Sequence, residues 1–147
     1  MEPQITKEVD DMGTGYFTVR WSALQKVDKF TILKSVPAMA GIFELYYQDP
    51  KKKLIRFYIA RVWIGGLRST LRMITDSTLH EHLDWIDTLE NKTCFFRYSL
   101  CSSFKDLVDV FYFFAETLYP GKKKTYHSRR FMDIRVNEIS PEKIVTI

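Results

Sequence analysis

Cysteine, glycine and proline are scarce in this chain of 147 residues, which contains two cysteines, six glycines and five prolines. So little glycine and proline excludes fibrous and low-complexity chains. Two cysteines and three histidines do not supply a spaced structural zinc site without added carboxylates, so Cys94 and Cys101 are expected to be free thiols. The chain also lacks the run of about 18 apolar residues that a membrane span needs, and its polar, acidic start is unlike a secretory signal. We therefore expect a cytoplasmic protein that does not cross a membrane.

The residues that are abundant favour one globular domain. Hydrophobic residues make up 46% of the chain and aromatic residues 15%, which argues against disorder. Because domains commonly run to about 100–200 residues, residues 1–147 are predicted to form a single domain with its own core.

Positive charge is in slight excess and is clustered. The net charge is +4, and the basic runs are Lys51–Lys53, Lys122–Lys124 and Arg129–Arg130. A positive field attracts polyanions through counterion release, so Lys51, Lys52 and Lys53 are candidate contacts to nucleic acid. The alternative for the lysine runs is an ordinary solvated surface that protects a strand edge.

Hydrophobic periodicity predicts an α+β domain, in which helices pack against a small mixed or antiparallel sheet. Residues 1–15 show no periodicity and are interpreted as an arm. The expected strands are 16–21, 41–47, 54–62, 93–100 and 134–147, and the expected helices are 22–33, 67–75, 79–89 and one that starts after Ser103 and stops at Pro120. The strands 41–47 and 54–62 are predicted to form a hairpin.

Several short motifs and single residues in the central part of the chain follow one another in the order of a known domain. Gly41-Ile42-Phe43 opens the first hairpin strand and Tyr58-Ile59-Ala60 falls late in the second. Arg68 comes eight residues after Ala60, on the next predicted helix, and Glu116 lies on the last one. This arrangement resembles the GIY-YIG endonuclease domain, whose members have the order β-β-α-β-α. The resemblance covers about residues 36–120, with extra elements at both ends of the chain.

The resemblance implies a metal-dependent phosphodiesterase that acts on DNA or RNA. In that family's chemistry, Tyr58 would position the attacking water, Arg68 would hold the scissile phosphate, and Glu116 would bind a Mg²⁺ ion that stabilises the leaving oxygen. Arg61 falls where some members carry a basic residue, and Arg72, one turn beyond Arg68, would contact the phosphate backbone.

Two departures from the family pattern support a second hypothesis. The tyrosine of the first motif is Phe43, which lacks the hydroxyl, and the glycine of the second is Ala60. A different register would place the second motif at Trp63-Ile64-Gly65, with Arg72 in the place of the arginine. The alternative to an enzyme is therefore a non-catalytic module that retains the fold and binds nucleic acid or a protein partner.

Overall fold

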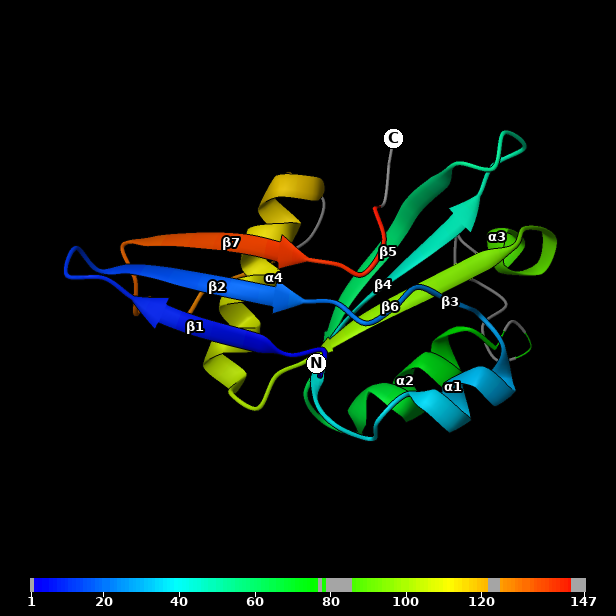
Figure 1. Cartoon of the computed structure of the whole chain (residues 1–147), viewed down its shortest axis with the longest axis horizontal. Helices are drawn as coiled ribbons and strands as arrows, with labels where there is room; N and C mark the ends of the chain where they lie inside the picture. Colours follow the sequence, from blue (N-terminus) through cyan, green and yellow to red (C-terminus); the bar gives the residue numbers. More distant parts are fainter. Residues whose placement is uncertain (1, 77, 79–85, 122–124, 144–147) are drawn as a thin grey trace.

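The computed structural model describes residues 2–76, 78, 86–121 and 125–143 (Figure 1). Its elements are, in chain order, β1 (Ile5–Val9), β2 (Thr14–Arg20), β3 (Gln25–Lys26), α1 (Lys29–Ser35), β4 (Gly41–Gln48), β5 (Leu54–Val62), α2 (Gly66–Ile74), α3 (Ile86–Asn91), β6 (Cys94–Leu100), α4 (Phe104–Leu118) and β7 (Asp133–Ile139). The protein is therefore of the α+β class, as the sequence predicts.

The strands form two sheets rather than the one that we expected. The larger sheet has the order β3-β6-β4-β5 and is antiparallel throughout. The smaller one has the order β1-β2-β7, in which β2 pairs antiparallel with β1 and parallel with β7. Hydrogen bonds join the sheets where β2 ends, because the Ser22 amide donates to Tyr98 O and the Ser99 hydroxyl donates to Arg20 O.

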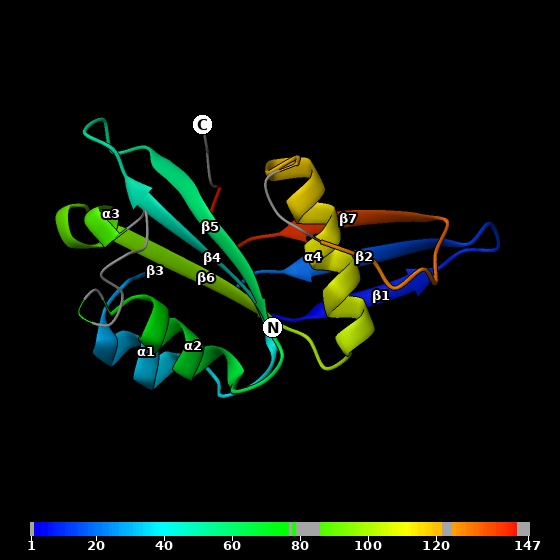
Figure 2. The same ribbon diagram turned by 180° about the vertical axis from the view of Figure 1, so that it is seen from behind.

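The larger sheet buries a hydrophobic core on each face, because successive side chains of a strand point to opposite sides. On one face, Phe43 and Leu45 of β4 pack with residues of α1 and α2, including Ile32 and Leu71. We call this the α1–α2 core. On the other face, Ile42 of β4 and Ile59 of β5 pack with α4 and the smaller sheet. We call this the α4 core. Its other buried members are Phe17, Val19, Trp21, Cys101, Leu107, Val110 and Phe114. Figure 2 shows α4 from its outer side, in front of β2 and β7.

Most of the predicted elements are confirmed, with shifted ends. The hairpin of β4 and β5, helix α2 and strand β6 lie within two residues of the expected ranges. The Ser103 side chain caps α4 as predicted, since its Oγ accepts a hydrogen bond from the Asp106 amide at 3.3 Å. Residues 79–85 of the predicted helix 79–89 lie outside the described residues, as do Lys122–Lys124, and α3 covers the end of that helix.

Three predictions near the chain ends were wrong. Residues 1–15 are not an arm, because β1 pairs with β2 along its whole length and Asp10 closes the turn by accepting from the Thr14 amide. The first helix starts at Lys29 rather than at Ser22, because Asp28 is its N-cap and the preceding residues form β3 beside β6. The last strand ends at Ile139, where its parallel partner β2 also ends.

Gly41 is required by close packing where β4 starts. A Cβ atom at this position would collide with the carbonyl oxygen of Ser99 and would lie 2.8 Å from Cδ1 of Leu67. We expect Gly41→Ala to lower the free energy of unfolding by about 3 kcal/mol, since overpacking moves backbone as well as side chains. Chemical denaturation measures the effect. Gly121→Ala is the control: its φ of 73° gives some strain, but the added Cβ would meet no atom of the described residues within 4 Å. Equal losses for the two variants would contradict the packing argument.

Candidate functional site

The structure places Tyr58 in the α1–α2 core. Its side chain lies half-buried against Phe43, with the two ring centroids 5.9 Å apart. Burial raises the pKa of the Tyr58 hydroxyl above its ordinary value. A phenol with a raised pKa is less often present as the phenolate that could accept a proton from water, so the environment of Tyr58 is that of a packing residue.

Arg68 lies on α2, on the outer side of the same layer. Its Nε donates a hydrogen bond of 2.7 Å to Val36 O, which ties α2 to the end of α1. Arg68 and Arg72 line one groove between α1 and α2, so the prediction that they share a helix face is confirmed.

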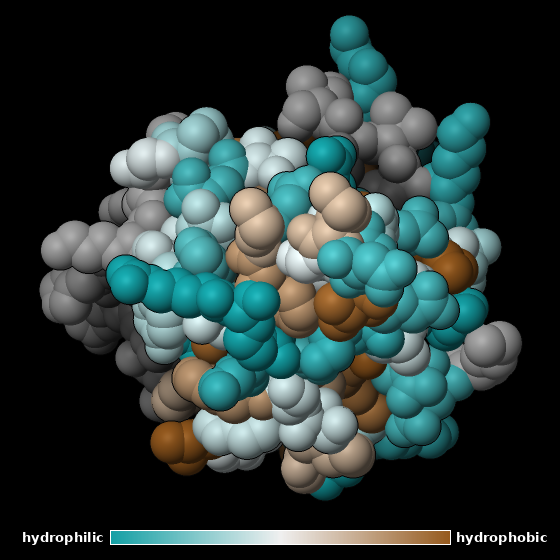
Figure 3. All heavy atoms as spheres, turned by 90° about the vertical axis from the view of Figure 1, so that its left-hand side faces the viewer, coloured by the Kyte–Doolittle hydropathy of each residue, from teal (hydrophilic) through white to brown (hydrophobic). Residues whose placement is uncertain are grey.

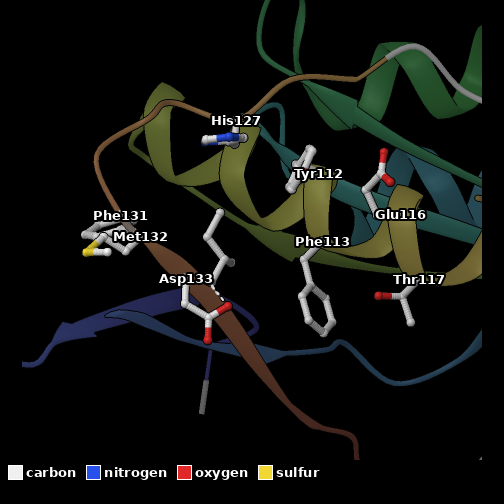
Figure 4. A pocket seen from close by; sticks show the side chains of 9 residues that line it. Tyr112, Phe113, Glu116, Thr117, His127, Phe131, Met132 and Asp133 are labelled. Carbon is white, nitrogen blue, oxygen red and sulfur yellow. Dashed lines mark hydrogen bonds between the residues drawn. The ribbon is translucent and has the colours of Figure 1, made fainter. Parts of the chain in front are cut away.

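Glu116 lies elsewhere, on the exposed side of α4. It lines a small pocket of about 220 Å³ between α4 and the segment that leads into β7. The rings of Tyr112 and His127 lie against each other in this pocket, with their centroids 4.9 Å apart and their planes tilted by 59°. Figure 4 shows the carboxylates of Glu116 and Asp133, which also lines the pocket, pointing in different directions.

The larger sheet therefore separates Glu116 from Arg68. Helix α2 packs on the face that carries Phe43, whereas α4 packs on the face that carries Ile42. The three residues of the predicted catalytic set, Tyr58, Arg68 and Glu116, are not brought together around one phosphate.

The predicted Mg²⁺ site has a single protein ligand, Glu116. Among the described residues, no group of three or more His, Cys, Asp or Glu side chains is placed to hold a metal ion. A Mg²⁺ ion needs only one or two carboxylates when a phosphate completes its coordination, but Arg68 would have to hold that phosphate from across the sheet from Glu116. The two cysteines are free and buried, and burial raises the pKa of each thiol to about 11.

Lys51, Lys52 and Lys53 form the exposed tip of the β4–β5 hairpin. The Asp49 carboxylate accepts hydrogen bonds from the amides of Lys51 and Lys53, at 2.9 and 2.8 Å, and Lys52 adopts a left-handed φ of 63°. The lysine side chains thus project from a hydrogen-bonded turn, at one end of the edge strand β5.

Arg61 lies at the opposite end of β5, in a cluster of exposed aromatic rings. Its guanidinium carbon is 5.4 Å from the ring centroid of Phe104 and 5.7 Å from that of Tyr126. Trp63 packs edge-on against Phe104, with the centroids 5.4 Å apart. The three rings come from separate parts of the chain, yet each is between 38% and 57% exposed. We call Arg61, Trp63, Phe104 and Tyr126 the Arg61 platform.

A buried aspartate holds one side of the Arg61 platform in place. Asp109 of α4 is fully buried and accepts hydrogen bonds from the Ser128 amide at 2.6 Å and the Ser128 hydroxyl at 2.7 Å. Arg130 donates to the same carboxylate at 2.8 Å. These contacts fasten the segment that carries Tyr126 across α4. Since the buried charge of Asp109 is paired, it does not cancel the positive charge of Arg61 at the surface.

Sequence reasoning identified Arg61 but missed its aromatic neighbours. Trp63 drew attention only as part of a motif in another register, and Phe104 resembled an ordinary first residue of a helix. Tyr126 stands in a segment without periodicity, beside basic residues. One signal in the sequence could have pointed to them: all three rings fall in turns or at helix ends, where few positions are buried, so they could be expected at the surface.

Comparison with known proteins identifies a family. A family model with the description "Uncharacterised protein" matches residues 4–147. No curated protein and no solved structure matches the chain. None of the helices in the described residues is both long and apolar enough to cross a membrane.

Proposed function

We propose that this chain, which belongs to the family matched over residues 4–147, binds unpaired bases of a single-stranded nucleic acid at the Arg61 platform without cleaving the strand. One observation carries the proposal: a half-buried arginine whose guanidinium carbon lies 5.4 and 5.7 Å from the centroids of two aromatic rings that remain exposed to solvent. Aromatic rings and guanidinium planes are the groups on which proteins stack single-stranded bases.

The composition of the Arg61 platform supports a polyanionic ligand. Among the described residues Arg61 forms no ion pair, so its charge is available to a phosphate. Lys105 follows Phe104 and Arg129 follows Tyr126 by three residues, and both side chains are exposed. Rings supply stacking surface and the surrounding cations supply electrostatic attraction, the two requirements for a single strand.

The lysines at the hairpin tip are a second contact for the same nucleic acid, at the other end of β5. Lys53 and Arg61 are eight residues apart on an extended strand, which corresponds to about 26 Å. A single strand of about 15 nucleotides is long enough to contact both the Arg61 platform and Lys51–Lys53. The lysines then contribute to affinity and salt dependence, whereas the rings favour unpaired bases.

The test is fluorescence anisotropy with labelled single-stranded DNA, single-stranded RNA and duplex DNA of about 15 nucleotides or base pairs at low salt. We expect the single strands to bind more tightly than the duplex. Tyr126→Ala should weaken single-strand binding about tenfold, while Tyr126→Phe should not, because stacking needs the ring and not the hydroxyl. Replacing Lys51, Lys52 and Lys53 together by alanine should reduce the slope of affinity against salt.

Two controls make the result interpretable. Tyr16→Ala removes another exposed tyrosine, from β2, and should leave binding unchanged. Each nucleic acid is also incubated with Mg²⁺ or Mn²⁺ and the wild-type protein, and in parallel with the Glu116→Ala variant, to detect cleavage. Cleavage that Glu116→Ala abolishes would overturn the proposal in favour of the metal-dependent phosphodiesterase. Absence of binding at low salt, or equal binding by Tyr126→Ala and the wild type, would overturn it as well.

A further inference from the structure

A second surface lies on the opposite side of the larger sheet from the Arg61 platform. It is a groove of about 510 Å³ between α1 and α2. Figure 1 shows these two helices side by side beneath the larger sheet, with no other element covering their outer side in that view. The groove is lined by Leu33, Ala38, Gly65, Arg68, Ser69, Arg72, Met73 and Asp76. We call it the α1–α2 groove. It lies apart from the Arg61 platform and takes no part in the function proposed above.

The α1–α2 groove and its margin expose large apolar side chains. Leu33 and Met73 line it, and Phe30 lies one turn before Leu33 on α1. Met39 lies between α1 and β4, and its carbonyl accepts a hydrogen bond from the Leu67 amide at the start of α2. The exposed fractions of these four apolar side chains run from 47% to 71%. Contiguous exposed apolar side chains rimmed by polar ones are typical of protein-binding surfaces. Methionine adapts its shape to different partners, which suits such a surface.

Among the described residues, more positive than negative side chains border the apolar surface. The Arg72 side chain forms no hydrogen bond or ion pair with another described residue, and the Arg68 side chain uses only its Nε, on Val36 O. Lys29 and Lys34 add two exposed cations on α1. Asp76 is the one carboxylate among the residues that line the groove. Complementarity therefore requires an occupant with an apolar side and acidic flanks.

We propose that the α1–α2 groove binds an amphipathic helix of a protein partner, with the helix's apolar side chains on Leu33 and Met73 and its acidic ones at Arg68 and Arg72. A helix is favoured because the groove lies between two helices, where the ridge of a third fits, and because no strand lines it. The apolar lining distinguishes it from the Arg61 platform, where exposed rings surround a cation.

The probe is a synthetic amphipathic peptide of about 14 residues, or about four helical turns, with leucines along one side and glutamates beside them. The protein is labelled with ¹³C at its methionine methyl groups. Addition of the peptide should shift the signals of Met39 and Met73 and leave those of Met12 and Met132 in place. The last two residues lie at the end that carries the β1–β2 turn, where Figure 3 shows brown hydrophobic groups among many teal hydrophilic ones.

Charge reversal tests the acidic complement. Arg72→Glu should weaken binding of the glutamate peptide at least about tenfold, and a peptide with lysines in place of the glutamates should then bind the variant better than it binds the wild type. This exchange separates a charge effect from a loss of folding. Met132→Ser, which removes a highly exposed methionine elsewhere, should bind the glutamate peptide as the wild type does.

Three results would overturn the proposal. The first is no shift at Met39 and Met73. The second is equal binding of the glutamate and lysine peptides to the wild type, which would indicate unspecific apolar contact. The third is a dimer in sedimentation experiments that Leu33→Glu dissociates, which would assign the α1–α2 groove to a second copy of the chain. None of these results bears on binding of nucleic acid at the Arg61 platform.

Discussion

Replacing Glu44 by alanine is expected to lower the free energy of unfolding by about 3–5 kcal/mol, the largest effect of any single change considered for this protein. Glu44 is fully buried in β4. Its carboxylate pairs with Arg56, accepts from Arg97 Nε at 2.7 Å, and accepts from the Tyr46 hydroxyl at 2.8 Å. Burial, together with the nearby charge of Glu44, raises the pKa of Tyr46 above its ordinary value. Without Glu44, two arginines remain in the interior with their main partner removed.

Equilibrium denaturation measures this effect, and a combined variant identifies its cause. Glu44→Leu with Arg56→Leu and Arg97→Met removes all three charges, and it should be more stable than Glu44→Ala because it leaves no unpaired charge. Asp133→Ala, at an exposed ion pair with Arg135, is the control and should leave the denaturation midpoint nearly unchanged. A loss below about 1 kcal/mol for Glu44→Ala would contradict the argument.

Replacing Asp109 by alanine is expected both to destabilise the protein, by about 3 kcal/mol, and to weaken nucleic-acid binding at least about tenfold, as Tyr126→Ala does. The change removes the acceptor of Ser128 and Arg130 and leaves their donors near a buried site. The segment that carries Tyr126 would then detach from α4, so that the ring no longer flanks Arg61. The expected result is a folded protein whose Arg61 platform lacks Tyr126 but keeps Trp63 and Phe104.

Limited trypsin digestion detects this detachment directly. Arg129 and Arg130 are potential cleavage sites within the fastened segment, and cleavage there should become much faster in Asp109→Ala than in the wild type. Asp106→Ala is the matched control, since it removes a more exposed carboxylate that pairs with Lys7 and Arg130 but leaves both Ser128 hydrogen bonds. Unchanged cleavage in Asp109→Ala, or equal acceleration in the two variants, would contradict the proposed role of Asp109.

Local sequence patterns were sufficient for most of the secondary structure. The N-cap at Ser103 and the apolar spacing after it predict α4, because capping and helix periodicity depend on residues at most four positions apart. The same holds for the hairpin of β4 and β5. Strand β1 escaped prediction because its pattern is polar and most of its side chains are exposed; pairing with β2 makes it a strand.

For the candidate sites too, local patterns were informative and contacts between distant segments were not predictable. The order of the motifs indicated a resemblance to a known domain, and it singled out Tyr58, Arg68 and Glu116. Whether those residues meet depends on which face of the larger sheet each helix covers, and no local pattern carries that information. In the structure α2 and α4 cover opposite faces, which separates Arg68 from Glu116.

By itself the sequence determined the α+β class and the central elements, and it singled out Arg61 as a basic residue next to a motif. Only the tertiary structure brought Trp63, Phe104 and Tyr126 around Arg61 and opened the α1–α2 groove beside Arg72. The physical reason is the distance along the chain over which each kind of interaction acts. Caps and periodicity act over one or two helical turns, whereas a platform built from three separate chain segments forms only after the core has packed and Asp109 has fastened the last of them.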